Sequence, residues 1–201
     1  MSRAEEILTF WFGSATGDAP PGDRFKLWFQ GGEDVDRTIR AQFGADVERA
    51  RSGALQSWAT TARGSLALIV LIDQFSRNLY RGSGEAFAKD DVARELTLTG
   101  LANGFYDQLG SFEQMFFLLP LGHSESLEHQ DRALALCEAW VVALPAALKG
   151  LGEGALQHAR QHRDVIARFG RFPTRNAALG RKSTPEEEAH IAEAKAAGRP
   201  V

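Results

Sequence analysis

The chain has 201 residues, of which 44% are hydrophobic and 24% are charged, and its formal net charge is −3 at pH 7. This composition is typical of a globular protein and excludes a disordered or fibrous chain. A negative net charge argues against nonspecific attraction to nucleic acid or to an anionic membrane, so we expect neither as a partner. The length fits one domain or one domain with a long tail, and we expect a single domain over residues 1–201.

Cysteine usage and the N-terminus indicate a cytoplasmic protein. Cys137 is the only cysteine, and the N-terminus lacks a basic segment followed by an apolar run. The longest apolar run, Leu66–Ile72, is too short to cross a bilayer as a helix. Basic residues are concentrated in residues 160–182, which hold seven Lys or Arg and one acidic residue. That segment carries about +6, and the rest of the chain carries about −9.

Helical periodicity begins close to the N-terminus. Ser2 and Glu5 form a capping-box pattern before a set of apolar residues at helical spacing, which predicts a helix that ends at Gly13. Residues 14–23 are rich in Gly, Pro and Asp and predict a loop. Apolar residues then recur every fourth position over residues 35–47, which predicts a long amphipathic helix.

The apolar run Leu66–Ile72 fits a buried strand or a buried helix by periodicity alone. Ser65 is available as a cap, no hairpin partner follows, and the segment continues to Tyr80 without a breaker, so a helix is favoured. A helix that is apolar on every side lies at the centre of a fold. We therefore expect this element to be the central one.

The second half of the chain also predicts helices. The first begins at Asp90 or Asp91, and the second begins at Ser111 with Gln114 and runs to Pro120. The third follows His123, directs Leu127 inward and ends near Pro145, and the fourth spans residues 155–169 with Ala155 and Ala159 inward. Thr184 and Glu187 form a capping-box pattern at the start of a peripheral C-terminal helix and tail at about 183–201. Seven to nine helices without a convincing strand predict an all-α fold. Short connections imply antiparallel hairpins, packed as a bundle or a short superhelix.

The first candidate site lies at the end of the central helix. Asp73, Arg77 and Arg81 are four residues apart and therefore share one helix face. They are either an intrahelical ion pair that also stabilises the helix C-terminus, or functional charges on a buried element.

The second candidate is the break between two apolar helices at His123 and Glu125. This pair could act as an acid and a base. Alternatively, Ser124 or Glu125 caps the next helix and His123 holds the loop in place.

The third candidate is His162 with Arg163, followed by Arg171 and Arg175. Several arginines around one loop suit a carboxylate or a phosphate. The alternatives are a hydrogen-bonded core histidine and a solvated basic surface.

No cofactor and no metal are expected. His158 and His162 have the spacing that places two imidazoles on one helix face, but no glutamate follows His158 and that residue suits a solvent-exposed face. The sequence lacks a phosphate loop, a dinucleotide fingerprint and a paired-cysteine zinc site. Cys137 lies among apolar residues and is expected to pack rather than react.

Several motifs together resemble a bacterial family called domain of unknown function 924. They are Phe10-Trp11-Phe12-Gly13, Trp28-Phe29, residues 71–78, Leu119-Pro120-Leu121, His123-Ser124-Glu125, His162-Arg163-Asp164 and residues 168–176. The resemblance covers about residues 5–190 and implies an all-helical fold similar to that of tetratricopeptide-repeat proteins. It implies no activity. Ser76 departs from the family's usual proline, and Gly122 stands where a polar or aromatic residue is common.

Three hypotheses follow from these candidates. In the first, arginines and histidines, oriented by Asp73, Glu125 and Asp164, bind an anionic small molecule or a peptide carboxylate. In the second, His123 or His162 is the general base of a hydrolase or transferase, and arginines stabilise an oxyanion. In the third, the motifs form a structural polar network in a protein-interaction scaffold. The sequence predicts no oligomeric state.

Overall fold

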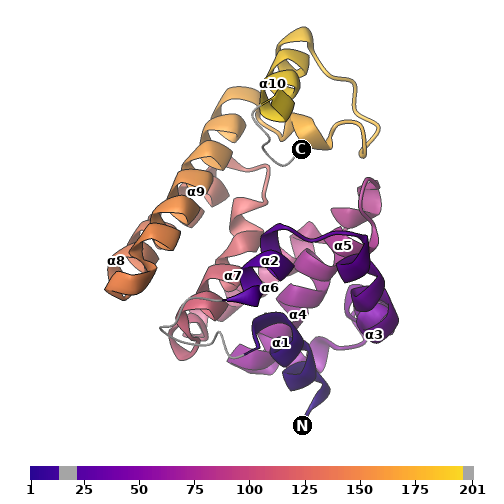
Figure 1. The fold of residues 1–201 in the computed structure, drawn as a ribbon, viewed down its shortest axis with the longest axis vertical. Helices are drawn as coiled ribbons and strands as arrows, with labels where there is room; N and C mark the ends of the chain where they lie inside the picture. The colour runs from indigo at the N-terminus through magenta and orange to yellow at the C-terminus, as the bar shows by residue number, and fades with distance from the viewer. Residues whose placement is uncertain (14–21, 197–201) are drawn as a thin grey trace.

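A computed structural model describes residues 1–13 and 22–196 (Figure 1). The α-helices are α1 (Arg3–Phe12), α2 (Asp23–Phe29), α3 (Glu33–Arg51), α4 (Ala62–Ile69), α5 (Ser76–Leu79), α6 (Asp90–Ala102), α7 (Ser111–Gly122), α8 (Leu127–Ala143), α9 (Lys149–Phe169) and α10 (Pro185–Ala196). A π-helical turn, Val70–Phe75, joins α4 to α5 in one continuous helix. The described residues therefore form nine helices and no strand, which confirms the all-α prediction.

Two further expectations concern the chain ends and the membrane. The loop expected at residues 14–23 and the expected C-terminal tail fall largely outside the described residues. Within the described part of the chain, no helix is both long enough and apolar enough to span a bilayer.

The central helix begins earlier than the sequence indicated. Its N-cap is Thr61, whose Oγ1 accepts a hydrogen bond from the backbone N–H of Gly64 at 3.1 Å. The expected cap, Ser65, is buried inside the helix, where its hydroxyl donates to the carbonyl of Ala59. Residues 64–73 are buried, as a central element requires.

Aromatic side chains form the core between α1, α2, α4 and α7. Phe116 of α7 makes edge-on contacts with Trp11, Phe12 and Trp28, at ring-centroid distances of 5.6, 5.5 and 4.8 Å. Phe75 packs on Trp11 in the same way. Edge-to-face packing of this kind adds to the stabilisation from apolar burial.

α7 begins and ends differently from the prediction. Its capping box uses Glu113, whose carboxylate accepts from the backbone N–H of Gly110, rather than Ser111 and Gln114. The helix also continues past Pro120 and ends at Gly122, with His123 as its C-cap.

α8 and α9 form a long antiparallel hairpin that packs on α7 (Figure 1). α8 ends at Ala143, close to the expected stop, but Leu127 is exposed rather than inward, because α8 buries Gln130 and Trp140 instead. α9 begins six residues before the expected start and ends at Gly170, whose φ of 68° suits glycine.

α10 lies beside the end of α9 (Figure 1). The predicted capping box is present, since Thr184 and Glu187 exchange backbone-to-side-chain hydrogen bonds of 2.8 and 3.2 Å.

Candidate functional site

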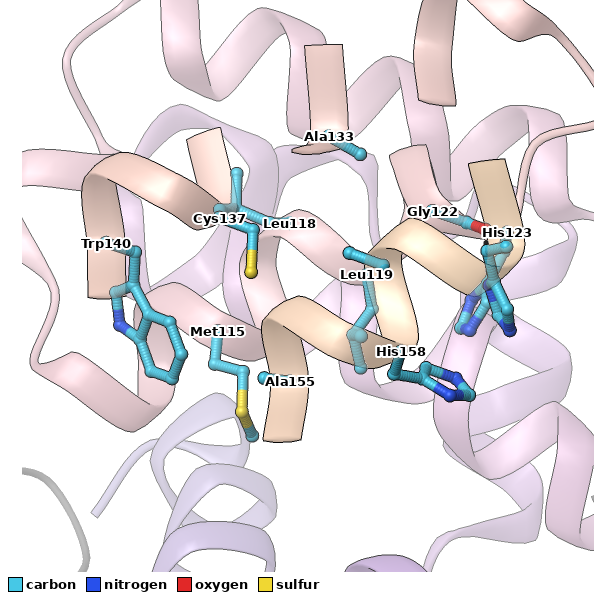
Figure 2. A pocket seen from close by; sticks show the side chains of 12 residues that line it. Met115, Leu118, Leu119, Gly122, His123, Ala133, Cys137, Trp140, Ala155 and His158 are labelled. Carbon is cyan, nitrogen blue, oxygen red and sulfur yellow. Dashed lines mark hydrogen bonds between the residues drawn. The ribbon is translucent and has the colours of Figure 1, made fainter. Parts of the chain in front are cut away.

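A pocket of about 80 Å³ lies between α7, α8 and α9 (Figure 2). Small residues create it, because Gly122, Ala133, Ala155 and Ala159 line the interface where larger side chains would fill the space. A methyl group added at Gly122 would meet no other atom within 4 Å. A volume of this size holds about two or three waters or a short aliphatic group.

The walls of the pocket are apolar at one end and carry imidazoles at the other. Met115, Leu118 and Trp140 line the apolar end, and three histidines line the polar end: His123, His158 and His162. Figure 2 shows Met115 and Trp140 on the side of the pocket away from His158.

Asp73 lies behind the polar end, in the π-helical turn of the central helix, and is fully buried. Arg77 donates to its backbone carbonyl at 2.7 Å and lies 3.1 Å from its Oδ1, while Gln74 donates to Oδ2. Burial raises the pKa of Asp73, but the charges of Arg77 and His123 outweigh that effect and hold the pKa below its ordinary value. Asp73 is therefore an anion in the folded protein at neutral pH.

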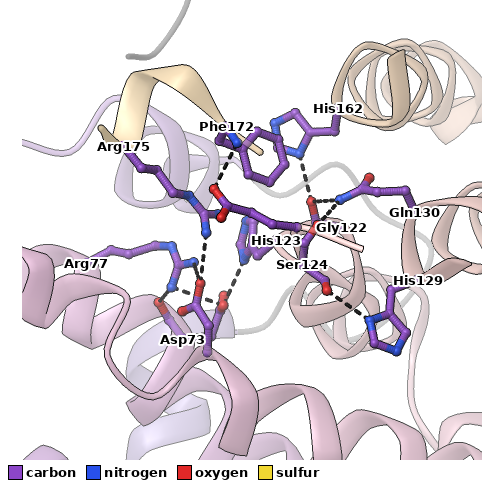
Figure 3. Close-up of polar contacts among 12 residues, drawn as sticks. Asp73, Arg77, Gly122, His123, Ser124, His129, Gln130, His162, Phe172 and Arg175 are labelled. Carbon is purple, nitrogen blue, oxygen red and sulfur yellow. Dashed lines mark hydrogen bonds and ion pairs between the residues drawn. The ribbon is translucent and has the colours of Figure 1, made fainter. Parts of the chain in front are cut away.

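His123 connects this carboxylate to the pocket. The residue is the C-cap of α7, and its Nδ1 lies 2.7 Å from Oδ1 of Asp73 (Figure 3). Because a carboxylate only accepts, Nδ1 carries a hydrogen and donates it. Among the described residues, Nε2 of His123 has no hydrogen-bond partner, and the side chain is 16% exposed. The free nitrogen is therefore available to a molecule in the pocket.

His162 is held in a different way. Its Nδ1 donates to the carbonyl of Gly122 at 3.0 Å, and that carbonyl also accepts from the buried Gln130 at 2.8 Å. Burial and the neighbouring imidazoles lower the pKa of His162 to about 3, so the ring is neutral at pH 7. The ring centroid lies 6.4 Å from that of His123 and 4.1 Å from that of His158, which is exposed. Neutral His162 therefore offers Nε2 as an acceptor.

Arg175 extends the polar cluster toward α6. Its guanidinium lies between the rings of Phe87 and Phe172, with its central carbon 4.7 and 4.5 Å from the ring centroids. It donates to Asp90 at 3.2 Å, and the same oxygen accepts from Arg77 at 3.0 Å. Burial lowers the pKa of Arg175. Two arginines and two aspartates, counting Asp73, therefore neutralise one another.

Glu125 connects the turn after α7 to the segment after α9. It accepts a hydrogen bond from the backbone N–H of Phe172 at 2.8 Å and two from Arg181 at 2.6 and 2.9 Å. Burial raises the pKa of Glu125, but these hydrogen bonds outweigh it and the pKa is lowered. Glu125 is thus not a helix cap, and Ser124 does not cap α8 either, because its hydroxyl contacts His129 at 2.9 Å.

Comparisons with known proteins agree with the motifs. A family described as bacterial proteins of unknown function (DUF924) matches residues 7–195. The chain belongs to this family. A solved structure of the protein of unknown function ATU0120 from Agrobacterium tumefaciens is similar over 94% of this chain and 97% of its own, with 34% identity and a TM-score of 0.78. No curated protein matches the chain.

In this DUF924 protein the structure gathers six of the nine predicted site residues around the polar end of the pocket: Asp73, Arg77, His123, Glu125, His162 and Arg175. The other three lie in separate ion pairs. Arg81 binds Asp36 of α3, Arg163 binds Asp131 of α8, and Arg171 binds Glu187 of α10. Each of the five predicted arginines therefore has a carboxylate partner.

Sequence reasoning missed several residues of this DUF924 site. Asp90 is not only the start of α6 but also the carboxylate shared by two arginines. His158 is exposed, as its position on a solvent face suggested, yet it also lines the pocket. Ala155, Ala159 and His162 share one face of α9, and their spacing indicated a contact with another helix. It did not indicate that this contact would contain a pocket. In the described part of the chain, no three His, Cys, Asp or Glu side chains are grouped as metal ligands.

Proposed function

We propose that this protein binds a small carboxylic acid with a short apolar tail, and that Nε2 of His123 holds the acid group. The observation that supports this most directly is the pairing of a fully buried carboxylate with an imidazole whose second nitrogen faces a pocket. Asp73 accepts from Nδ1 and fixes the ring, and in the imidazolium form Nε2 donates a charge-assisted hydrogen bond to a carboxylate.

The arginines contribute indirectly to this proposal. Arg77 and Arg175 are neutralised by Asp73 and Asp90, so they add little attraction for an anion. They hold Asp73 in its charged form and connect α5, α6 and the segment after α9. The anion partner expected from the sequence is therefore assigned to His123.

The rest of the pocket suits an apolar tail. Met115, Leu118 and Trp140 present hydrocarbon and aromatic surface, and Cys137 adds a thiol whose pKa is raised by burial. Transfer of each methylene from water to such a surface stabilises the complex by about 0.8 kcal/mol.

Calorimetric titration with pentanoate tests the proposal. We expect the wild type to bind pentanoate and His123→Gln to bind it at least about tenfold more weakly, because Gln cannot donate a charge-assisted hydrogen bond in that position. The matched control is His129→Gln, since His129 contacts Ser124 and does not line the pocket. Equal affinity in the wild type and in folded His123→Gln would remove the proposed site.

A second function is favoured by the convergence of His123 and His162 on one pocket, with ring centroids 6.4 Å apart. A carboxylate-bound imidazole is the arrangement that enzymes use for general acid–base catalysis. In that case His123 is the catalytic base and Asp73 positions it. Turnover of an ester or amide probe that disappears in His123→Gln and persists in His129→Gln would establish this activity.

A further inference from the structure

A second pocket of about 80 Å³ adjoins the first at the same histidines. It lies between α9, residues 172–174 and α10. His158 and His162 line both pockets, so this pair of imidazoles is their common boundary. We call the pocket between α7, α8 and α9 the inner pocket and this one the outer pocket.

The boundary between the two pockets is open to solvent. The rings of His158 and His162 are 4.1 Å apart, and His158 is exposed. On the outer side, the ring of Phe172 packs edge-on against His162 at 5.0 Å. One elongated molecule can therefore cross the imidazole pair at the surface and enter both pockets.

The two pockets differ in chemistry. Apart from its histidines, the inner pocket is lined mainly by apolar side chains, whereas the outer pocket also has polar side chains among its apolar ones: Gln161, Thr174 and His190. Within the described ranges 1–13 and 22–196, these three side chains have no hydrogen-bond partner in the protein. They are free to bind polar groups of a ligand.

We propose that the ligand has two arms joined by an amide or ester: an acyl chain in the inner pocket, the link at the histidines, and a polar end group in the outer pocket. This inference rests on the proposed function, because the acyl arm occupies the same site as the short acid. The hydrogen-bonding groups of an amide link match the histidines at the boundary between the pockets. His123 donates to the carbonyl oxygen of the link, and Nε2 of neutral His162 accepts from its N–H. N-acyl amino acids belong to this chemical class.

Residues 172–174 form the turn that lines one side of the outer pocket. Glu125 holds the backbone of Phe172, and Arg175 stacks on its ring. These contacts fix the turn that carries Thr174 into the outer pocket. The arginine-rich segment thus shapes the second site without binding the ligand itself.

Titration of three probes, pentanoate, N-methylpentanamide and N-pentanoylserine, tests the inference. We expect N-pentanoylserine to bind the wild type about tenfold more tightly than N-methylpentanamide, which has the same acyl chain and amide but no polar end group, as one or two added hydrogen bonds provide. The double variant Gln161→Leu, Thr174→Val removes two of the three polar side chains with little change in volume, and it should reduce this gain to less than about threefold while leaving pentanoate affinity unchanged. Thr60→Val, in the turn before α4, is the matched control and should keep the gain.

The outcomes separate this inference from the proposed function. If pentanoate binds through His123 but N-pentanoylserine gains nothing, or if the gain survives in the double variant, the outer pocket is not part of the site. If none of the three probes binds the wild type, both proposals are wrong. Thermal unfolding of each variant shows whether a loss of affinity reflects a loss of folding.

Discussion

The aromatic core and the interface of the α8–α9 hairpin with α7 are built from side chains of different size. At the core, Phe116 meets three other aromatic rings edge-on and is 1% exposed. At the hairpin interface, Gly122, Ala155 and Ala159 face one another across a pocket. Both regions contact α7, so one helix has a filled side and an unfilled side. Apolar residues at helical spacing therefore specify contact between helices, whereas residue size decides whether that contact is filled.

The largest expected effect is in the core. Phe116→Ala should lower the free energy of unfolding by about 3–5 kcal/mol, because the lost ring leaves a cavity among rigid aromatic neighbours. Chemical denaturation measures the change, with Phe29→Ala as the control because Phe29 is 55% exposed. A loss below about 1 kcal/mol for Phe116→Ala would mean that the core collapses around the gap and that the two regions do not differ as described.

A second effect depends on pH and belongs to the hairpin interface. The folded state lowers the pKa of His162 from 6.5 to about 3, so the unfolded chain binds a proton there first as the pH falls. The contribution of neutral His162 to the free energy of unfolding is complete above pH 6.5. It decreases as the pH falls toward 3, by up to about 1.4 kcal/mol per pH unit.

His162→Gln should flatten this part of the stability curve, because Gln can still donate to the carbonyl of Gly122 but does not titrate. Denaturation midpoints between pH 7 and pH 4 measure the slope, and His129→Gln serves as the control. An unchanged slope in His162→Gln would show that another group governs the acid response. Asp73, whose pKa is lowered, adds to the loss only below about pH 4.

The smallest expected change in stability comes from filling the pocket. Ala159→Leu should change the free energy of unfolding by less than about 1.5 kcal/mol, since the added carbons enter existing space. The same variant should lose pentanoate binding, which calorimetry measures against Ala139→Leu on the exposed face of α8. A destabilisation comparable to that of Phe116→Ala would show that the interface is already as tightly filled as the core.

Much of the fold followed from local patterns. The capping residues Ser2 and Thr184, the start of α6 at Asp90 and the stop of α9 at Gly170 were all found in the structure. The predicted cap was wrong where two nearby residues could both have served as the N-cap. Thr61 caps the central helix instead of Ser65, because Thr61 has the extended backbone that an N-cap requires, whereas Ser65 already lies inside the helix.

The candidate site was only partly visible in the sequence. The spacing of Asp73 and Arg77 gave an ion pair as one of two interpretations, since residues four apart on a helix are neighbours, and the structure contains that pair. The same spacing suggested that Arg81 would join them, but Arg81 pairs with Asp36 of α3. Arginine density likewise pointed to an anion site, yet partners from distant helices neutralise these arginines. Spacing reports neighbours within one helix and carries no information on charges that another helix supplies.

The amino-acid sequence by itself determined the all-helical class, the central position of the apolar helix and the segments that hold ionisable side chains. These properties depend on helical periodicity and on hydrogen bonds within a few residues along the chain. Only the tertiary structure decided that Asp73 meets His123 fifty residues later in the chain, and that small residues on three helices leave a pocket beside that imidazole. Both results depend on how helices pack against one another, and packing sums over contacts that local sequence does not encode.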